Sequence, residues 1–243
     1  QFSGYLDYDS NSQAAVTGTG NENQIWTIGG RQAGKMLGLD YRGEYYHQWG
    51  AGNGQKDGNA TTDADRSAYM FGLRVGKTFN NVSFKPGVTL WYDYVSGTND
   101  EDQRDGSWNS FNTLFDTGHK FYGLQDLFLG VGGGGAAGTQ GLGLQDLALK
   151  TKLNPMPGWT LKVDYHWFWT AESVAANTTT RGFANVTAAG QDPLGNTLGN
   201  EIDVTAITKM NANTKVMIGY SNFNGTYAFS SLKDQGAPGG LFG

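Results

Sequence analysis

Residues 34–49, GKMLGLDYRGEYYHQW, decide the fold class. The odd-numbered positions of this stretch are mostly apolar or aromatic, whereas Asp40, Arg42 and Glu44 occupy even-numbered positions. Side chains along a β-strand point alternately to opposite faces of the sheet. The pattern therefore predicts a strand with one apolar, aromatic face and one charged face.

The same alternation recurs along the chain. It is clear in 66–77, 82–95, 158–169 and 201–209, and weaker in 1–9 and 22–30. In 142–153 it changes phase near Gln145, and in 214–229 it holds only up to Tyr220. The predicted strands run for about 10 to 16 residues, against about 5–6 for a strand of a globular protein. Aromatic residues gather near strand ends, and charges and glycines fill the polar face, as in outer-membrane barrels. The sequence therefore favours an antiparallel transmembrane β-barrel over a soluble β-sandwich or solenoid.

Composition excludes several other classes of protein. The 243 residues contain no cysteine, which rules out a disulfide framework, a thiolate metal site and a cysteine nucleophile. The net charge of −5 argues against nucleic-acid binding, which needs a basic face. No apolar run approaches the ~18 residues of a transmembrane helix.

Short connections alternate with long polar ones. The short ones are expected near 31–34, 79–81, 154–158 and 210–213, and the long ones near 10–21, 50–64, 97–138 and 171–198. Bacterial outer-membrane barrels have short periplasmic turns and long external loops. We therefore expect one β-barrel domain over residues 1–243, with nine strands at 1–9, 22–31, 34–49, 66–79, 82–96, 140–153, 158–171, 199–210 and 213–229.

An odd number of strands is unusual for such a barrel. Either these residues form an incomplete part of a larger barrel, or a hairpin within 116–138 raises the count. Ten to twelve strands that close on themselves remain an alternative.

Residues 107–129, SWNSFNTLFDTGHKFYGLQDLFL, form the most specific segment of the chain. This segment, with residues 142–168 and 201–223, resembles the alginate-export family of outer-membrane porins. The resemblance covers roughly residues 65–230. It implies a barrel that passes solutes across the outer membrane of a Gram-negative bacterium. Alginate is the cargo of the family's namesake, whose lumen is rich in arginine; this chain has six arginines and charges of both signs.

A solute pathway needs charged side chains on the inside of the barrel, because they set its selectivity. Many of them are expected to pair across neighbouring strands, as Lys162 and Asp164 do if they approach Lys150 and Lys152. The expected pore-lining residues are Asp40, Arg42, Glu44, Arg66, Arg74, Lys85, Asp93, Lys150, Lys152, Lys162, Asp164, Glu201 and Asp203.

The loop 97–138 is a candidate constriction that folds into the lumen. A poorly ordered external loop is the alternative. The expected constriction residues are Phe111, Leu114, Phe115, Thr117, Gly118, His119, Lys120 and Tyr122.

The sequence gives no support for an enzymatic function. The three histidines lie on separate segments, and neither a nucleophile elbow nor a phosphate-binding loop is present. The acidic stretches 63–65 and 99–102 lack the spacing of a calcium loop, so neither a metal nor a cofactor is expected.

We therefore expect an outer-membrane channel that passes small hydrophilic, anionic or saccharide solutes by passive diffusion. Its expected partners are membrane lipid and the solute. The alternative is a structural barrel that sheaths or anchors a partner protein in the outer membrane. A soluble β-sandwich that binds carbohydrate through its tryptophans is a third interpretation.

Overall fold

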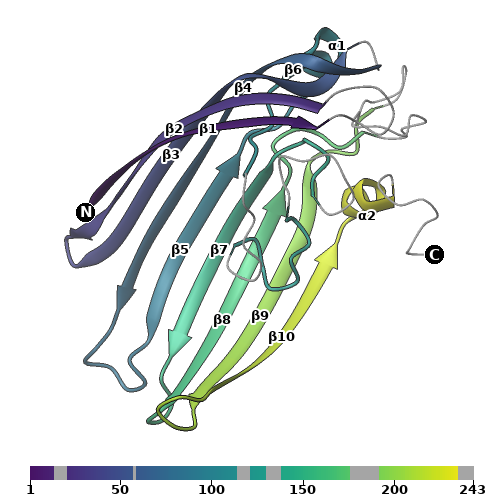
Figure 1. The fold of residues 1–243 in the computed structure, drawn as a ribbon. Helices are drawn as coiled ribbons and strands as arrows, with labels where there is room; N and C mark the ends of the chain where they lie inside the picture. Colours follow the sequence, from purple (N-terminus) through teal and green to yellow (C-terminus); the bar gives the residue numbers. More distant parts are fainter. Residues whose placement is uncertain (14–20, 57–58, 114–120, 130–137, 176–191, 235–243) are drawn as a thin grey trace.

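The computed structural model describes residues 1–13, 21–56, 59–113, 121–129, 138–175 and 192–234 (Figure 1). These residues form ten strands and two short helices. The strands are β1 (Phe2–Gln13), β2 (Asn21–Met36), β3 (Leu39–Lys56), β4 (Asn59–Thr78), β5 (Gly87–Val95), β6 (Ser107–Trp108), β7 (Leu144–Leu153), β8 (Trp159–Trp169), β9 (Thr197–Lys209) and β10 (Lys215–Gly225). The helices are α1 (Asp100–Asp105) and α2 (Tyr227–Asp234).

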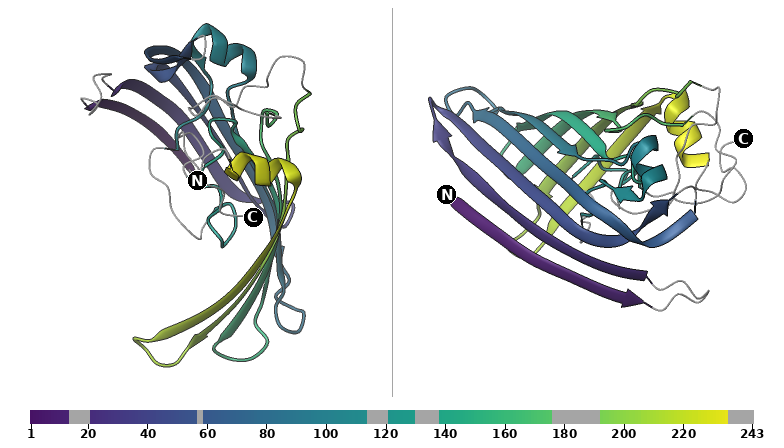
Figure 2. Two further views of the ribbon diagram at one scale, coloured as in Figure 1. Left: turned by 90° about the vertical axis from the view of Figure 1, so that its right-hand side faces the viewer. Right: turned by 90° about the horizontal axis from the view of Figure 1, so that it is seen from above.

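The long strands form one antiparallel meander. Their order in the sheet is β1-β2-β3-β4-β5-β7-β8-β9-β10, and the two-residue strand β6 pairs in parallel with β4. The sheet is twisted and curved, with tight turns at one end and both helices at the other (Figures 1 and 2). We call these the turn end and the loop end. In the described part of the chain, β1 and β10 each pair with a single strand, so the sheet is open there.

The two faces of the sheet have inverted polarity. We call the face against which the described loop residues between β6 and β7 pack the inner face, and the sheet curves around it (Figure 2). Many charged side chains on this face are buried, among them Arg74 (6% exposed) and Glu201 (0%). Apolar side chains point to the opposite, outer face, where Leu73 and Leu90 are each 53% exposed. Water disfavours such an apolar surface, so the outer face fits an apolar surrounding.

The expected all-β antiparallel fold is confirmed, and nine long strands are present in the described residues. A two-sheet sandwich is wrong for this part of the chain, because all its strands belong to one sheet. No helix among the described residues is long and apolar enough to cross a membrane.

The turn expected at residues 31–34 is misplaced. β2 runs past it, and the chain reverses at Leu37 and Gly38, with φ angles of 53° and 77°. Gly38 takes this left-handed conformation without steric cost because it has no Cβ. The pairing of β2 with β3 continues unbroken through 31–34, so a turn assigned from residue type alone was wrong.

The long connections expected at 10–21 and 50–64 are shorter than predicted. β1, β3 and β4 extend into them, and the β3–β4 register shifts between Gly52 and Gly54. Strands pair through their backbones, so polar and glycine-rich residues extend the sheet without an apolar alternation that reveals it.

The segment expected to open the fifth strand is a turn instead. β5 begins at Gly87, because Phe84 and Lys85 adopt left-handed φ angles of 65° and 44° and Pro86 has no backbone N–H to donate. Lys85 therefore lies in a turn and not on a strand. The last strand, expected to run to residue 229, ends at Gly225, and α2 follows it.

The expected loop 97–138 contains α1 and β6. The Asn99 side chain accepts a hydrogen bond from the Asp102 N–H (2.8 Å), and Gly106 ends the helix with a φ of 92°. This acidic stretch is therefore a capped helix. Residues 121–129 hold no strand, and the remainder of the hairpin considered within 116–138 lies mostly outside the described residues.

An apolar core fills the inner face at the loop end. Phe128, from the loop before β7, packs with Phe168 of β8 and with Leu232 of α2. The loop and the last helix thus supply the apolar partners that the charged strands lack. The other buried members are Ala68, Val95, Phe111, Tyr122, Leu142, Leu144, Val174, Leu198 and Ala228.

Candidate functional site on the inner face

An ion-pair ladder crosses β3, β4 and β5 at mid-height. Arg74 lies between two carboxylates, with Nη1 2.5 Å from Glu44 Oε1 and Nη2 3.2 Å from Asp93 Oδ1. Arg42 contacts the second oxygen of Glu44 at 2.7 Å. Gly72 leaves the room for this, because a Cβ there would lie 2.6 Å from Asp93 Oδ1. These charges neutralise one another.

A second cluster is centred on His166 of β8. Its Nδ1 lies 2.8 Å from Asp146 Oδ1, and its Nε2 lies 3.0 Å from the ammonium of Lys150 and 4.0 Å from Asp203. Lys150 also pairs with Asp164 at 3.3 Å. Alternate positions on β7, β8 and β9 face the same side, which brings these groups together.

Two carboxylates of β9 hold the tip of the inner loop. Glu201 Oε1 accepts backbone hydrogen bonds from Leu124 (2.7 Å) and Gln125 (3.1 Å), and Asp203 Oδ2 accepts from Leu124 (3.1 Å). Gly123 adopts a φ of 87°, and a Cβ there would lie 2.5 Å from Glu201 Oε1. Glycine is therefore required for this close approach.

The first part of the loop is fixed by side chains of the sheet. Gln48 donates to the Asn112 carbonyl and accepts from the Asn112 N–H, both at 2.8 Å. Arg66 donates to the Ser110 carbonyl at 2.8 Å. Buried polar groups are costly unless paired, so these bonds hold the loop on the inner face.

Lys233 of α2 contacts the inner loop at two points along the chain. Its Nζ donates to the carbonyls of Leu127 (2.6 Å) and Gly138 (3.1 Å) and lies 5.3 Å from the centre of the Phe128 ring. Burial lowers the pKa of Lys233 to about 8. Desolvation disfavours the charged form of a lysine, which is the direction seen.

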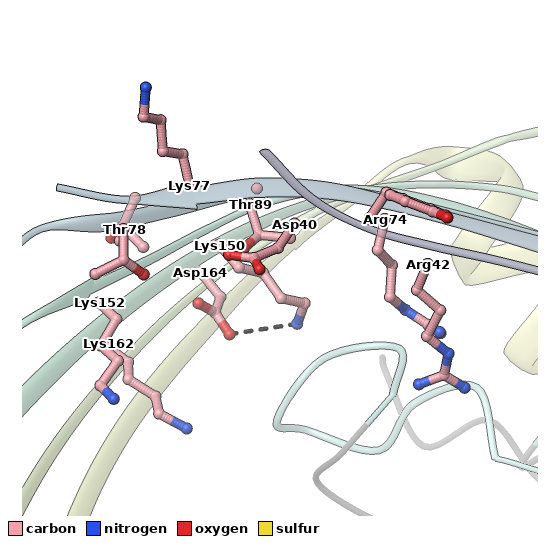
Figure 3. Close-up of a pocket in the computed structure, with 14 residues that line it drawn as sticks. Asp40, Arg42, Arg74, Lys77, Thr78, Thr89, Lys150, Lys152, Lys162 and Asp164 are labelled. Atoms are coloured by element: carbon pink, nitrogen blue, oxygen red, sulfur yellow. Dashed lines mark hydrogen bonds and ion pairs between the residues drawn. The ribbon is translucent and has the colours of Figure 1, made fainter. Parts of the chain in front are cut away.

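Toward the turn end, the inner face is hollowed by a cavity of about 340 Å³ (Figure 3). Lys152 and Lys162 occupy directly opposed positions on β7 and β8 and point into this space with Arg42. The ammonium group of neither lysine makes a hydrogen bond or an ion pair with another described residue. Lys77 points to the other side of the sheet (Figure 3).

The structure places the expected pore-lining residues on the inner face, with the exception of Lys85. Phe111 and Tyr122, of the expected constriction, are buried in the inner-face core. The other expected constriction residues, Leu114, Phe115, Thr117, Gly118, His119 and Lys120, lie outside the described residues.

Sequence reasoning did not select several residues that hold this face together. They are Gln48, Asp146, His166, Phe128 and Lys233. Strand parity could have found His166 and Asp146, which lie on the same face as chosen residues of the same strands. Lys233 and Phe128 gave no such signal, because neither lies on a strand.

A comparison of the chain with family models shows the family to which it is related. A family model described as alginate export matches residues 1–231. The chain belongs to the alginate export family. This is a family of outer-membrane porins, which are transport channels and not enzymes. The match begins well before residue 65, where the sequence resemblance was first clear. Comparison with curated proteins gives no match.

Proposed function

We propose that this member of the alginate export family is a passive channel of the Gram-negative outer membrane. Its solutes are small, hydrophilic and anionic, with charged saccharides among them. Solutes move along the inner face from one end of the sheet to the other, down their gradient. The apolar outer face supports contact with membrane lipid.

One observation carries the preference for anions. Most charges of the inner face are neutralised by a partner within hydrogen-bonding distance, whereas Lys152 and Lys162 face the cavity without one among the described residues. Unpaired cations in a partly enclosed space attract anions and repel cations, which sets the selectivity of a pore. The cavity is therefore the proposed selective segment.

The described part of the loop between β6 and β7 is the proposed constriction. It lies on the inner face, and its contacts with Gln48, Arg66 and Glu201 hold it there. A segment fixed in this position narrows the path at the loop end.

The test is single-channel recording of the purified protein in a planar bilayer. Stepwise, ohmic currents with a reversal potential on the anion-selective side are expected in a salt gradient. The double variant Lys152→Gln/Lys162→Gln is expected to move the reversal potential toward zero. The matched control is Lys77→Gln, whose ammonium projects to the other side of the sheet.

A folded, heat-modifiable protein that never conducts would refute the channel and favour the structural sheath. Conduction with the same ion preference in the double variant and in the parent would refute the role of the two lysines.

A further inference from the structure

A second cavity, of about 770 Å³, lies at the turn end of the sheet. The turn before β5 and the turn between β7 and β8 pack together there, with the Asn154 N–H donating to the Phe84 carbonyl at 2.7 Å. Lys85, Lys209 and Lys215 all line this cavity, and no acidic residue does. We call it the rim cavity.

The lysines of the rim cavity stand in an arrangement that is unfavourable without a counter-charge. Lys209 and Lys215 are directly opposed across β9 and β10. Like charges at opposed positions of an antiparallel pair destabilise the sheet. The ammonium groups of the three rim lysines make no hydrogen bond or ion pair with another described residue. An anion between them would relieve the repulsion.

Lys209 and Lys215 of the rim cavity are arranged like the two lysines of the inner cavity. Lys152 and Lys162 are also directly opposed, on β7 and β8. Lys162 faces Thr205 on β9, and Lys209 lies four residues further along that strand. A strand rises about 3.3 Å per residue, so the two lysine pairs are about 13 Å apart along the sheet.

Side-chain alternation places both lysine pairs on the inner face. Thr205 shares the face of Lys162, and Lys209 shares the parity of Thr205. The rim cavity therefore opens to the same side as the inner cavity, and it fits a dissolved ligand better than a lipid on the outer face. Met156, also in the lining, supplies apolar surface beside the lysines.

We propose that the rim cavity is a separate binding site for oxyanions, of the carboxylate or phosphate class. It captures anions that arrive from the turn end and passes them to the inner cavity. The effect on flux rests on the proposed channel function, whereas anion binding itself does not.

Binding is tested on the full protein in an uncharged, phosphate-free detergent, with inorganic tripolyphosphate as the probe. The isothermal titration curve of the parent protein is expected to require a fit with two classes of binding site. The variant Lys209→Gln is expected to weaken one class at least tenfold, and Lys209→Gln/Lys215→Gln to abolish it. Lys77→Gln, which removes one charge from the other side of the sheet, is the matched control and is expected to keep both classes.

Sided addition in planar bilayers tests the capture role. Tripolyphosphate added from the turn end is expected to block the parent current at a faster rate than it blocks the double variant. Addition from the loop end is expected to give equal rates. Equal titrations for the parent and the double variant would refute the rim site, even in a protein that conducts. If Lys209→Gln/Lys215→Gln abolishes one class of tripolyphosphate site and the parent never conducts, the channel function fails and the rim site stands.

Binding that appears only after anionic phospholipid is added, and that tripolyphosphate does not displace, would also overturn the proposal. It would assign the lysines to a lipid headgroup.

Discussion

Replacement of Phe128 by alanine tests whether the inner loop is held by its apolar contacts. Phe128 is fully buried, and its ring centre lies 4.6 Å from that of Phe168 and 6.0 Å from that of Phe229. A buried Phe→Ala change costs about 3–5 kcal/mol. Each 1.4 kcal/mol is a factor of ten, so the docked loop is expected to lose stability by a factor of about 100 to 4,000.

The effect on transport is read from single-channel records, and the effect on the loop from amide hydrogen exchange. Phe128→Ala is expected to raise the open-state current and its noise, and to accelerate exchange at residues 121–129. The matched control is Phe71→Ala on the outer face, where the ring stacks on Tyr94 at 5.2 Å. It removes the same atoms without touching the loop. A folded Phe128→Ala protein with parental current and parental exchange would show that the loop neither depends on this core nor constricts the pathway.

Three further perturbations address the loop tip, the outer face and α2. Gly123→Ala places a Cβ 2.5 Å from Glu201 Oε1 and is expected to accelerate amide hydrogen exchange of the next two residues. The control is Gly38→Ala, at a position with a similar positive φ but open space around it, and it is expected to leave the loop unchanged. Equal exchange in both variants would contradict the close approach of Gly123 to Glu201. Leu90→Arg places a charge on the outer face, which costs about 2–4 kcal/mol near the middle of a bilayer, and is expected to lower the urea midpoint for folding in lipid vesicles; a parental midpoint would argue against lipid contact. Folding lowers the pKa of Lys233 from 10.5 to about 8, so between pH 8 and 10.5 the unfolded state binds more protons than the folded state. Docking of α2 is therefore expected to strengthen as the pH rises from about 8 to 10.5. Amide exchange of α2 measures this, and a pH response that survives in Lys233→Met would assign it to another group.

The positions of strands could be predicted wherever every second side chain points to an apolar environment. Leu73 and Leu90 stand in clear alternation, and the expected strands around them are present. The turn at Leu37 and Gly38 was missed because glycine also occurs within strands of this chain. The hairpin that extends into 50–64 was missed because its polar residues give no period of two.

The candidate site was predictable as a face but not as a set of contacts. Alternation alone assigned Arg74, Asp93 and Glu201 to the same side of the sheet. It did not indicate that Arg74 is neutralised by two carboxylates while Lys152 and Lys162 are not. Cross-strand register decides this, because a shift of one residue in pairing changes every neighbour.

The sequence by itself determined the period of two, the charged and apolar faces, and the resemblance to the alginate export family. Each is local, because neighbouring residues of a strand alternate whatever the strand pairs with. Only the tertiary structure decided that Phe128 and Lys233 fasten the loop to the inner face, and that opposed lysines meet at the turn end. The loop contacts join residues far apart in the chain and depend on the path of the loop through space, whereas the opposition of the lysines depends on strand register.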